Sequence, residues 1–194
     1  MQSGTPQPSS PAPHRIELSL RDVNQLFNTM DPSPFHEKDL DHDAEEFIES
    51  WALEYPLDEP IVLVIHLSEM PTDPECTTMV SRAVHHYFDY RAQLNRMEFR
   101  RLMQEGRKSL LIGLLFVSAC LGIAELLARL SEGTMIKVLR ESLTIGGWVA
   151  LWRPLEIYLY DWWPLRRRGK ALTKLSQMQV EIVQRNQKRE LPSR

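Results

Sequence analysis

The strongest pattern along the chain is an apolar run from Leu110 to Ala128, in which Glu125 is the only charged residue. As an α-helix this run would be about 28 Å long, at about 1.5 Å of rise per residue. That length matches the hydrocarbon core of a bilayer, which is roughly 30 Å thick. We therefore predict a transmembrane helix over residues 109–130.

A second apolar segment, residues 143–164, is rich in Trp and Tyr but carries Arg153, Glu156 and Asp161. A central arginine costs roughly 2.5–3.5 kcal/mol on membrane-insertion scales. The aromatic residues at its C-terminal end are typical of a membrane interface and favour insertion. We predict a second transmembrane helix here, joined to the first by a short extracytoplasmic loop over residues 131–142. An interfacial or re-entrant second segment is the alternative.

Basic residues lie before the first apolar segment and after the second. Two spans place both groups on the same, cytoplasmic side, as the positive-inside rule requires, whereas a single span would separate them. The sequence therefore predicts a two-span protein of the plasma (inner) membrane with cytoplasmic N- and C-termini. The basic collar expected to contact lipid headgroups consists of Arg107, Lys108, Arg166, Arg167, Arg168 and Lys170.

Residues 15–76 show the patterns of a small α/β head. Ile16–Leu20 alternates apolar and polar residues, and the β-branched run Ile61–Leu67 is continuously apolar, so both are predicted strands. Between them, Val23–Met30 and the segment from Ala44 to Tyr55 have apolar residues at helical spacing. The head is then β-α-α-β. Because two strands make a marginal sheet, we expect pairing with a second subunit or a covering of helices.

A long helical pattern begins near Thr77, and no proline interrupts it before Pro154. Residues 77–108 are therefore predicted to form a juxtamembrane helix that continues into the membrane. The basic residues 165–194 are predicted to form a C-terminal amphipathic helix, which lies on the inner leaflet or packs back along the juxtamembrane helix. The Pro/Ser-rich residues 1–14 are predicted to be disordered. The expected fold class is α+β, a small cytoplasmic head followed by a long helical hairpin.

Charge is segregated along the chain. Residues 1–90 carry 17 acidic and 4 basic side chains, a net charge of −13, although the whole chain carries only −3. The charged residues inside the apolar segments, Glu125, Arg153 and Glu156, are the intramembrane polar candidates. Arg153 and Glu156 are spaced to pair on one helix face, which fits either a structural register or a path for ions or protons.

The sequence predicts no catalytic, cofactor-binding or metal site. It contains no phosphate-binding glycine loop and no CxxC or HExxH motif. Asp39, Asp41 and Asp43 have the spacing of a calcium loop, but the glycine and the final glutamate of that loop are missing. We expect helix-capping acids instead, with Asp43 as the N-cap. A further alternative is an enzyme site at the membrane surface that uses His36, Asp39 or His42.

The stretches IELSLRDVNQLFN and DPSPFHEKDLDHDAEEFIESWALEYP resemble a family of uncharacterised bacterial membrane proteins that carry a similar Asp-Pro-Ser-Pro-Phe segment. The resemblance covers the N-terminal part of the chain. It implies a bacterial inner-membrane setting, and it transfers no activity and no site residue.

The sequence favours a membrane-anchored, non-enzymatic interaction, regulatory or scaffold protein with an acidic cytoplasmic docking head. Its expected partners are membrane lipids, a second copy of the chain in a homodimer, or a membrane or cytoplasmic protein. Nucleic acid is not expected, because the basic collar adjoins apolar segments. The alternative is a small transport or channel component that uses Glu125, Arg153 and Glu156.

Overall fold

The computed structural model describes residues 13–69, 75–130 and 133–185. The chain divides into two compact units, Met1–Leu94 with Arg168–Arg194, and Asn95–Arg167. We call the first the head unit and the second the hairpin unit. Most of the predicted disordered N-terminus lies outside the described residues, although His14 already belongs to the first strand.

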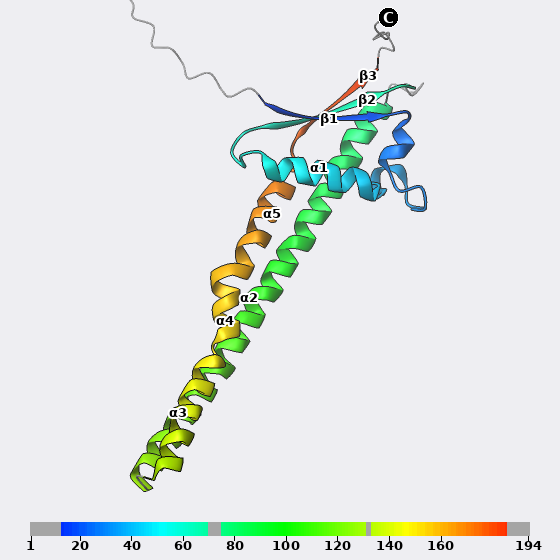
Figure 1. Cartoon of the computed structure of the whole chain (residues 1–194). Coiled ribbons are helices and arrows are strands. Elements are labelled where there is room, and N and C mark those ends of the chain that lie inside the picture. The colour runs from blue at the N-terminus through cyan, green and yellow to red at the C-terminus, as the bar shows by residue number, and fades with distance from the viewer. Residues whose placement is uncertain (1–12, 70–74, 131–132, 186–194) are drawn as a thin grey trace, which may run out of the picture. The chain divides into compact units, whose positions relative to one another are not determined.

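The head unit contains a three-stranded parallel sheet in the order β1-β2-β3 (Figure 1). The strands are β1 (His14–Leu20), β2 (Ile61–Leu67) and β3 (Gln179–Gln184). Both predicted strands are confirmed. The unbroken apolar run of β2 follows from its place between two neighbours, where nearly all of its side chains are buried.

The third strand corrects the prediction of a single C-terminal helix over residues 165–194. Helix α5 (Trp162–Leu175) ends early, and after a turn the chain enters β3 beside β2. Val180 and Ile182 pack on the core with the period of a strand. The edge of β2 has backbone groups that need hydrogen-bond partners, and β3 provides them. The extra strand expected from a second subunit is therefore supplied by the chain itself.

Helix α1 (His42–Glu54) confirms the clearest helix predicted in the head. Its N-cap is Asp41, whose carboxylate accepts the Asp43 N–H at 3.1 Å, so the prediction of Asp43 as the cap is wrong. The acids that follow in the first turn suit the positive end of the helix dipole.

The predicted helix over Val23–Met30 is wrong beyond its first turn. A 3-10 helix, η1, covers Val23–Leu26, and a second short one, η2, covers Phe35–Glu37. After η1 the backbone becomes extended at Phe27, which forms an antiparallel bridge with Leu40. This pairing with a distant segment overrides the local helical pattern.

The head core lies between one face of the sheet and three helices, of which α2 (Cys76–Leu130) is the longest. The C-terminal helix α5 packs on the same core as the first turns of α2, which agrees with the predicted packing back along that helix. The fully buried residues of the head core include Ile16, Leu63, Ile65, Ile48, Ala52, Val84, Phe88, Leu172 and Leu175.

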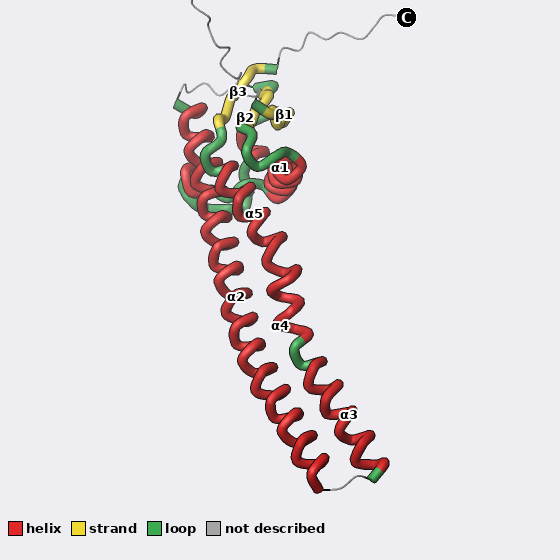
Figure 2. Tube along the Cα trace, turned by 90° about the vertical axis from the view of Figure 1, so that its left-hand side faces the viewer, coloured by secondary structure: helices red, strands yellow, loops and turns green. Residues whose placement is uncertain are grey.

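In the hairpin unit, α2 forms the first arm and residues 134–167 form the second arm beside it (Figure 2). The predicted continuity of the juxtamembrane and apolar helices is confirmed. The predicted loop over residues 131–142 is wrong from Thr134 onward, because α3 (Thr134–Val149) begins there with Gly133 as its N-cap. Residues 134–142 lie on this helix, and no proline or glycine interrupts its first three turns.

The predicted second transmembrane segment, residues 143–164, is not one continuous helix. After α3 the chain forms α4 (Trp152–Glu156), then the π-helix η3 (Ile157–Asp161), which leads into α5. Pro154 explains the break, because a proline ring clashes with the carbonyl group four residues earlier, here that of Ala150.

Glycine residues allow the two arms to approach closely. A Cβ atom added to Gly113 would lie 3.0 Å from Leu151 Cδ2 and 3.1 Å from the Ala150 carbonyl oxygen. A Cβ atom added to Gly147 would lie 3.3 Å from Cys120 Cβ. These contacts fix the register in which the second arm returns along the first.

Candidate functional site

Two acidic residues of the second arm, Glu156 and Asp161, cluster around Arg153. Its guanidinium pairs with Glu156 at 3.2 Å, as their spacing predicts, and with Asp161 at 3.2 Å. It also pairs with Glu105 of the first arm at 3.1 Å. The sequence gives no signal for Glu105, because it lies 48 positions earlier and meets Arg153 only when the arms pair. Arg153 thus links the two arms.

Glu125 lies far from this cluster. Its carboxylate pairs with Arg129, one helical turn later, at 3.2 Å. The continuous helix from Glu105 to Glu125 covers about 30 Å at about 1.5 Å per residue. The three intramembrane candidates, Glu125, Arg153 and Glu156, are therefore not brought together, and a polar path through all three has no continuity in the hairpin unit.

The register of the arms places Arg153 near one end of the apolar run. Leu151 packs at Gly113, so Arg153 is level with the start of the run at Leu110. The longest charge-free stretch of the second arm is 142–152, which is about 16 Å of helix. The two apolar segments are therefore staggered, and the band without charge on both arms is about half as thick as a bilayer core.

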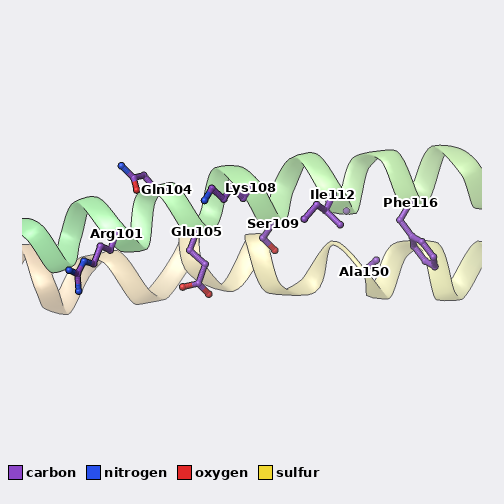
Figure 3. A pocket seen from close by; sticks show the side chains of 9 residues that line it. Arg101, Gln104, Glu105, Lys108, Ser109, Ile112, Phe116 and Ala150 are labelled. Carbon is purple, nitrogen blue, oxygen red and sulfur yellow. The ribbon is translucent and has the colours of Figure 1, made fainter.

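A groove of about 670 Å³ lies on one side of the hairpin unit, and we call it the hairpin groove (Figure 3). Its charged end is lined by Arg101, Glu105 and Lys108, with the polar side chains of Gln104 and Ser109 beside them. Toward the tip of the hairpin the lining becomes apolar, with Ile112, Gly113 and Phe116 from α2 and Ala150 from the second arm. The groove thus changes from charged to apolar along α2.

The residues of the predicted basic collar lie at two different levels. Arg107 and Lys108 are exposed on α2 next to the apolar run. Asn95 donates a hydrogen bond to the carbonyl of Leu165 at 2.9 Å, so Arg166 and Arg167 stand about 18 Å farther from that run than Arg107. Exposed Arg166 lies over the ring of Trp162 at 5.6 Å, and Lys170 is exposed.

Arg168 and Lys170 belong to the head unit, and Arg168 differs from the exposed Lys170 because it pairs with a buried acid. Its guanidinium donates to both carboxylate oxygens of Glu49 on α1, the second at 2.9 Å. Glu49 is only 9% exposed. A buried carboxylate held by two donors fixes α1 to α5, so Arg168 is engaged with α1 within the head unit.

A matching cluster fixes α1 to α2. Glu45, 8% exposed, accepts the Tyr87 hydroxyl at 2.6 Å and pairs with Arg91. Burial, together with the hydrogen bond to Glu45, raises the pKa of the Tyr87 phenol above its ordinary value of 10.0. The spacing of the apolar residues in α1 gives no sign that long-range partners bury Glu45.

The exposed side of α1 carries a row of aromatic side chains, which we call the aromatic row. Phe47 and Trp51 are each 39% exposed, and their ring centroids are 6.1 Å apart. Trp51 lies 6.0 Å from Tyr55, which stacks on His14 of β1 at 4.2 Å. The apolar face predicted for this helix is therefore only partly covered by the core.

Other candidate positions form no constellation. Within the described ranges, no group of three or more His, Cys, Asp or Glu side chains is placed to hold a metal ion. Asp39 donates its N–H to Asp31, and this bond, with those from Ser33, lowers the pKa of the Asp31 carboxyl. The side chain of His36 lies outside the described part of the chain. Comparison with known proteins finds no matching family model, curated protein or solved structure.

Proposed function

We propose that this chain is a membrane-anchored, non-enzymatic interaction protein, with its hairpin in the plasma (inner) membrane and its acidic head docking a partner in the cytoplasm. The observation that carries the proposal is the apolar stretch of α2. Among the described helices, α2 is the one long and apolar enough to span a membrane, and only 22% of that stretch is buried. Leu111, Ile112 and Leu115 are all more than 60% exposed. Transfer of this apolar surface from water to lipid would be strongly favourable.

The proposed anchor crosses the bilayer as a hairpin with a short charge-free band. Lys108 and Arg153 mark its cytoplasmic level, and Lys137 and Arg140 mark the level near the tip. Long basic side chains can extend from a helix toward the interface while their methylene groups stay in lipid. Local thinning of the bilayer reduces the remaining mismatch at modest cost. Both termini then lie on the cytoplasmic side.

The topology can be tested with a single cysteine at the tip. We expect a membrane-impermeant maleimide added outside intact cells to label the Gly133→Cys variant, because two spans expose the tip on that side. The wild-type chain is the control: Cys76 lies in the head, and Cys120 is buried against Gly147. Labelling only after permeabilisation contradicts the two spans. Release of the chain by alkaline carbonate contradicts the anchor itself.

The aromatic row is the proposed docking surface of the head. Exposed acidic residues, Glu46, Glu54 and Asp58, are interspersed with it along the sequence, and residues 1–90 carry a net charge of −13. Exposed aromatic side chains contribute most strongly to binding when a partner buries them, and the surrounding charge selects the partner. The complementary partner is a basic protein segment with apolar side chains.

Removing the aromatic row should abolish docking without unfolding the head. A photocrosslinking residue at Ser50, exposed on α1, would report the partner in native membranes. We expect the double variant Phe47→Ala/Trp51→Ala to reduce the yield of adducts to a basic segment at least about tenfold. Tyr90→Ala removes a 50% exposed aromatic side chain elsewhere on the head and should leave the yield unchanged. Equal loss in both variants, or adducts confined to acidic segments, would refute the proposed surface.

A further inference from the structure

We propose that the hairpin groove binds one anionic phospholipid of the cytoplasmic leaflet, with its phosphate at Arg101 and Lys108 and an acyl chain along Ile112 and Phe116. This inference rests on the proposed membrane insertion and makes it specific. The groove lies wholly within the hairpin unit, and all of its lining residues belong to the described part of the chain.

The charged end of the groove suits a phosphate group. Arg101 and Lys108 are two helical turns apart on α2 and line the same groove (Figure 3). Gln104 and Ser109 add neutral hydrogen-bond donors between and beside them. Glu105 is the one acid in this lining, and its carboxylate is already paired with Arg153 at 3.1 Å. The end of the groove therefore keeps two basic side chains for an anion, and arginine and lysine are the usual phosphate partners.

The other end of the groove suits an acyl chain. Gly113 has no side chain and Ala150 only a methyl group, so no bulky side chain from these two positions fills the groove between the arms. Ile112 and Phe116 are 67% and 51% exposed and line the same groove. The lining changes from charged to apolar between Lys108 and Ile112, where the apolar run begins. A phospholipid of the cytoplasmic leaflet makes the same transition at that depth, so the polarity of the groove and that of the ligand coincide.

A second groove supplies a matched control. It is lined by Arg100 and Arg107 together with Phe99, Met103 and Tyr158. It has the same number of basic residues on the same helix, but its lining does not continue beyond Arg107 into the apolar run. Arg100→Gln/Arg107→Gln therefore removes the same charge as Arg101→Gln/Lys108→Gln without touching the hairpin groove.

The test is native mass spectrometry of the full-length chain in detergent, with phosphatidylglycerol or phosphatidylcholine of equal chain length added. We expect the wild type to retain one phosphatidylglycerol in preference to phosphatidylcholine. The Arg101→Gln/Lys108→Gln variant should lose this preference about tenfold or more, and the single variants should be intermediate. All four positions are exposed, so the variants should fold. Arg107 belongs to the basic collar but does not line the hairpin groove, so Arg100→Gln/Arg107→Gln should weaken only general attraction to anionic headgroups and retain the one-lipid preference within about twofold.

Several outcomes would overturn the site. Equal loss in the two double variants would show general attraction by the basic helix, and no headgroup preference in the wild type would show no site. Competition by soluble glycerol phosphate as effective as that by phosphatidylglycerol would show an anion site without an acyl chain. A chain that resists carbonate extraction but lacks the preference refutes this inference alone, whereas a chain released by carbonate refutes the membrane anchor as well.

Discussion

Replacing Glu45 with alanine is expected to destabilise the head by about 3 kcal/mol, the low end for a broken buried ion pair. Glu45 is 8% exposed and accepts the Tyr87 hydroxyl while it pairs with Arg91. Its removal leaves a phenol and a guanidinium facing a cavity without their acceptor. Because Arg91 is about one-third exposed and can reach water, the cost stays below that of a fully enclosed pair. Hydrogen exchange of head amides in the detergent-solubilised chain measures the loss.

The neighbouring acid provides the control for this prediction. Glu46 is exposed one position later on α1, so Glu46→Ala should change the stability of the head by less than about 0.5 kcal/mol. Tyr87→Phe should cost about 1 kcal/mol, the net value of one hydrogen bond. Because the pKa of Tyr87 is raised in the folded head, the stabilisation that its protonated hydroxyl contributes is complete below about pH 10 and is lost as the pH rises further. Tyr87→Phe should abolish this pH dependence of stability. A cost for Glu46→Ala equal to that for Glu45→Ala would assign the effect to helix charge instead.

The elements that the sequence predicted well are those whose signal is local. The apolar run of β2 and the stripe of α1 each lie within one element, and burial of that element satisfies them directly. The long helix α2 has no proline to interrupt it, so its continuity could be predicted from the head to the tip of the hairpin. Nothing distant in the chain competes with these patterns.

The errors arise where a distant segment decides the local structure. The alternation of Val180 and Ile182 is compatible with a strand, but the apolar residues between 172 and 182 are also compatible with a helix. Only the pairing of this segment with the edge of β2 decides between the two. Phe27 continues a helical pattern, but its bridge to Leu40 ends the helix after one 3-10 turn. In both cases hydrogen bonding across many residues outweighs a propensity difference of a few tenths of a kcal/mol.

The candidate site was only partly predictable for the same reason. Arg153 and Glu156 are neighbours in sequence, so their pairing could be anticipated, whereas Glu105 enters through the register of the arms. That register depends on where the chain turns, and the first helical residue after the turn is Thr134, near the start of the predicted loop. The shift moves Arg153 from the middle of a predicted span to a level near the start of the apolar run of α2. An arginine at that level costs far less than one at the centre of the bilayer.

The aromatic row shows a different limit of sequence reasoning. The pattern of α1 gives an apolar face, but it does not say how much of that face the core covers. Ala44, Ile48 and Ala52 are buried, whereas Phe47 and Trp51 lie at the edge of the stripe and remain 39% exposed. Only the positions of the sheet and of α2 decide where the covered part ends. The residues that we assign to docking are therefore the same ones that periodicity alone would place in the core.

Replacing Gly113 with leucine is expected to separate the two arms of the hairpin. A Cβ atom at this position already meets the Ala150 carbonyl oxygen at 3.1 Å, and backbone cannot move aside as a side chain can. Overpacking of this kind costs about 1–3 kcal/mol. The native Cys120 supplies a reporter, because a Cβ atom on Gly147 would lie 3.3 Å from Cys120 Cβ, just below the range of about 3.5–4.5 Å found in disulfides. In the Gly147→Cys background, we expect oxidation to link the arms efficiently, and Gly113→Leu should reduce the linked fraction severalfold.

Gly122 provides the matched comparison, because it lies on the same helix and no neighbouring atom of the described residues lies within 4 Å of its added Cβ. Gly122→Leu should leave the linked fraction unchanged and stabilise the first arm by up to about 1 kcal/mol, since leucine favours a helix more than glycine does. The two substitutions add the same side chain to α2, so opposite effects isolate the contact between the arms from helix propensity. If both variants link as efficiently as the parent, the close approach at Gly113 does not hold the hairpin together, and the register that places Arg153 at the end of the apolar run loses its main support.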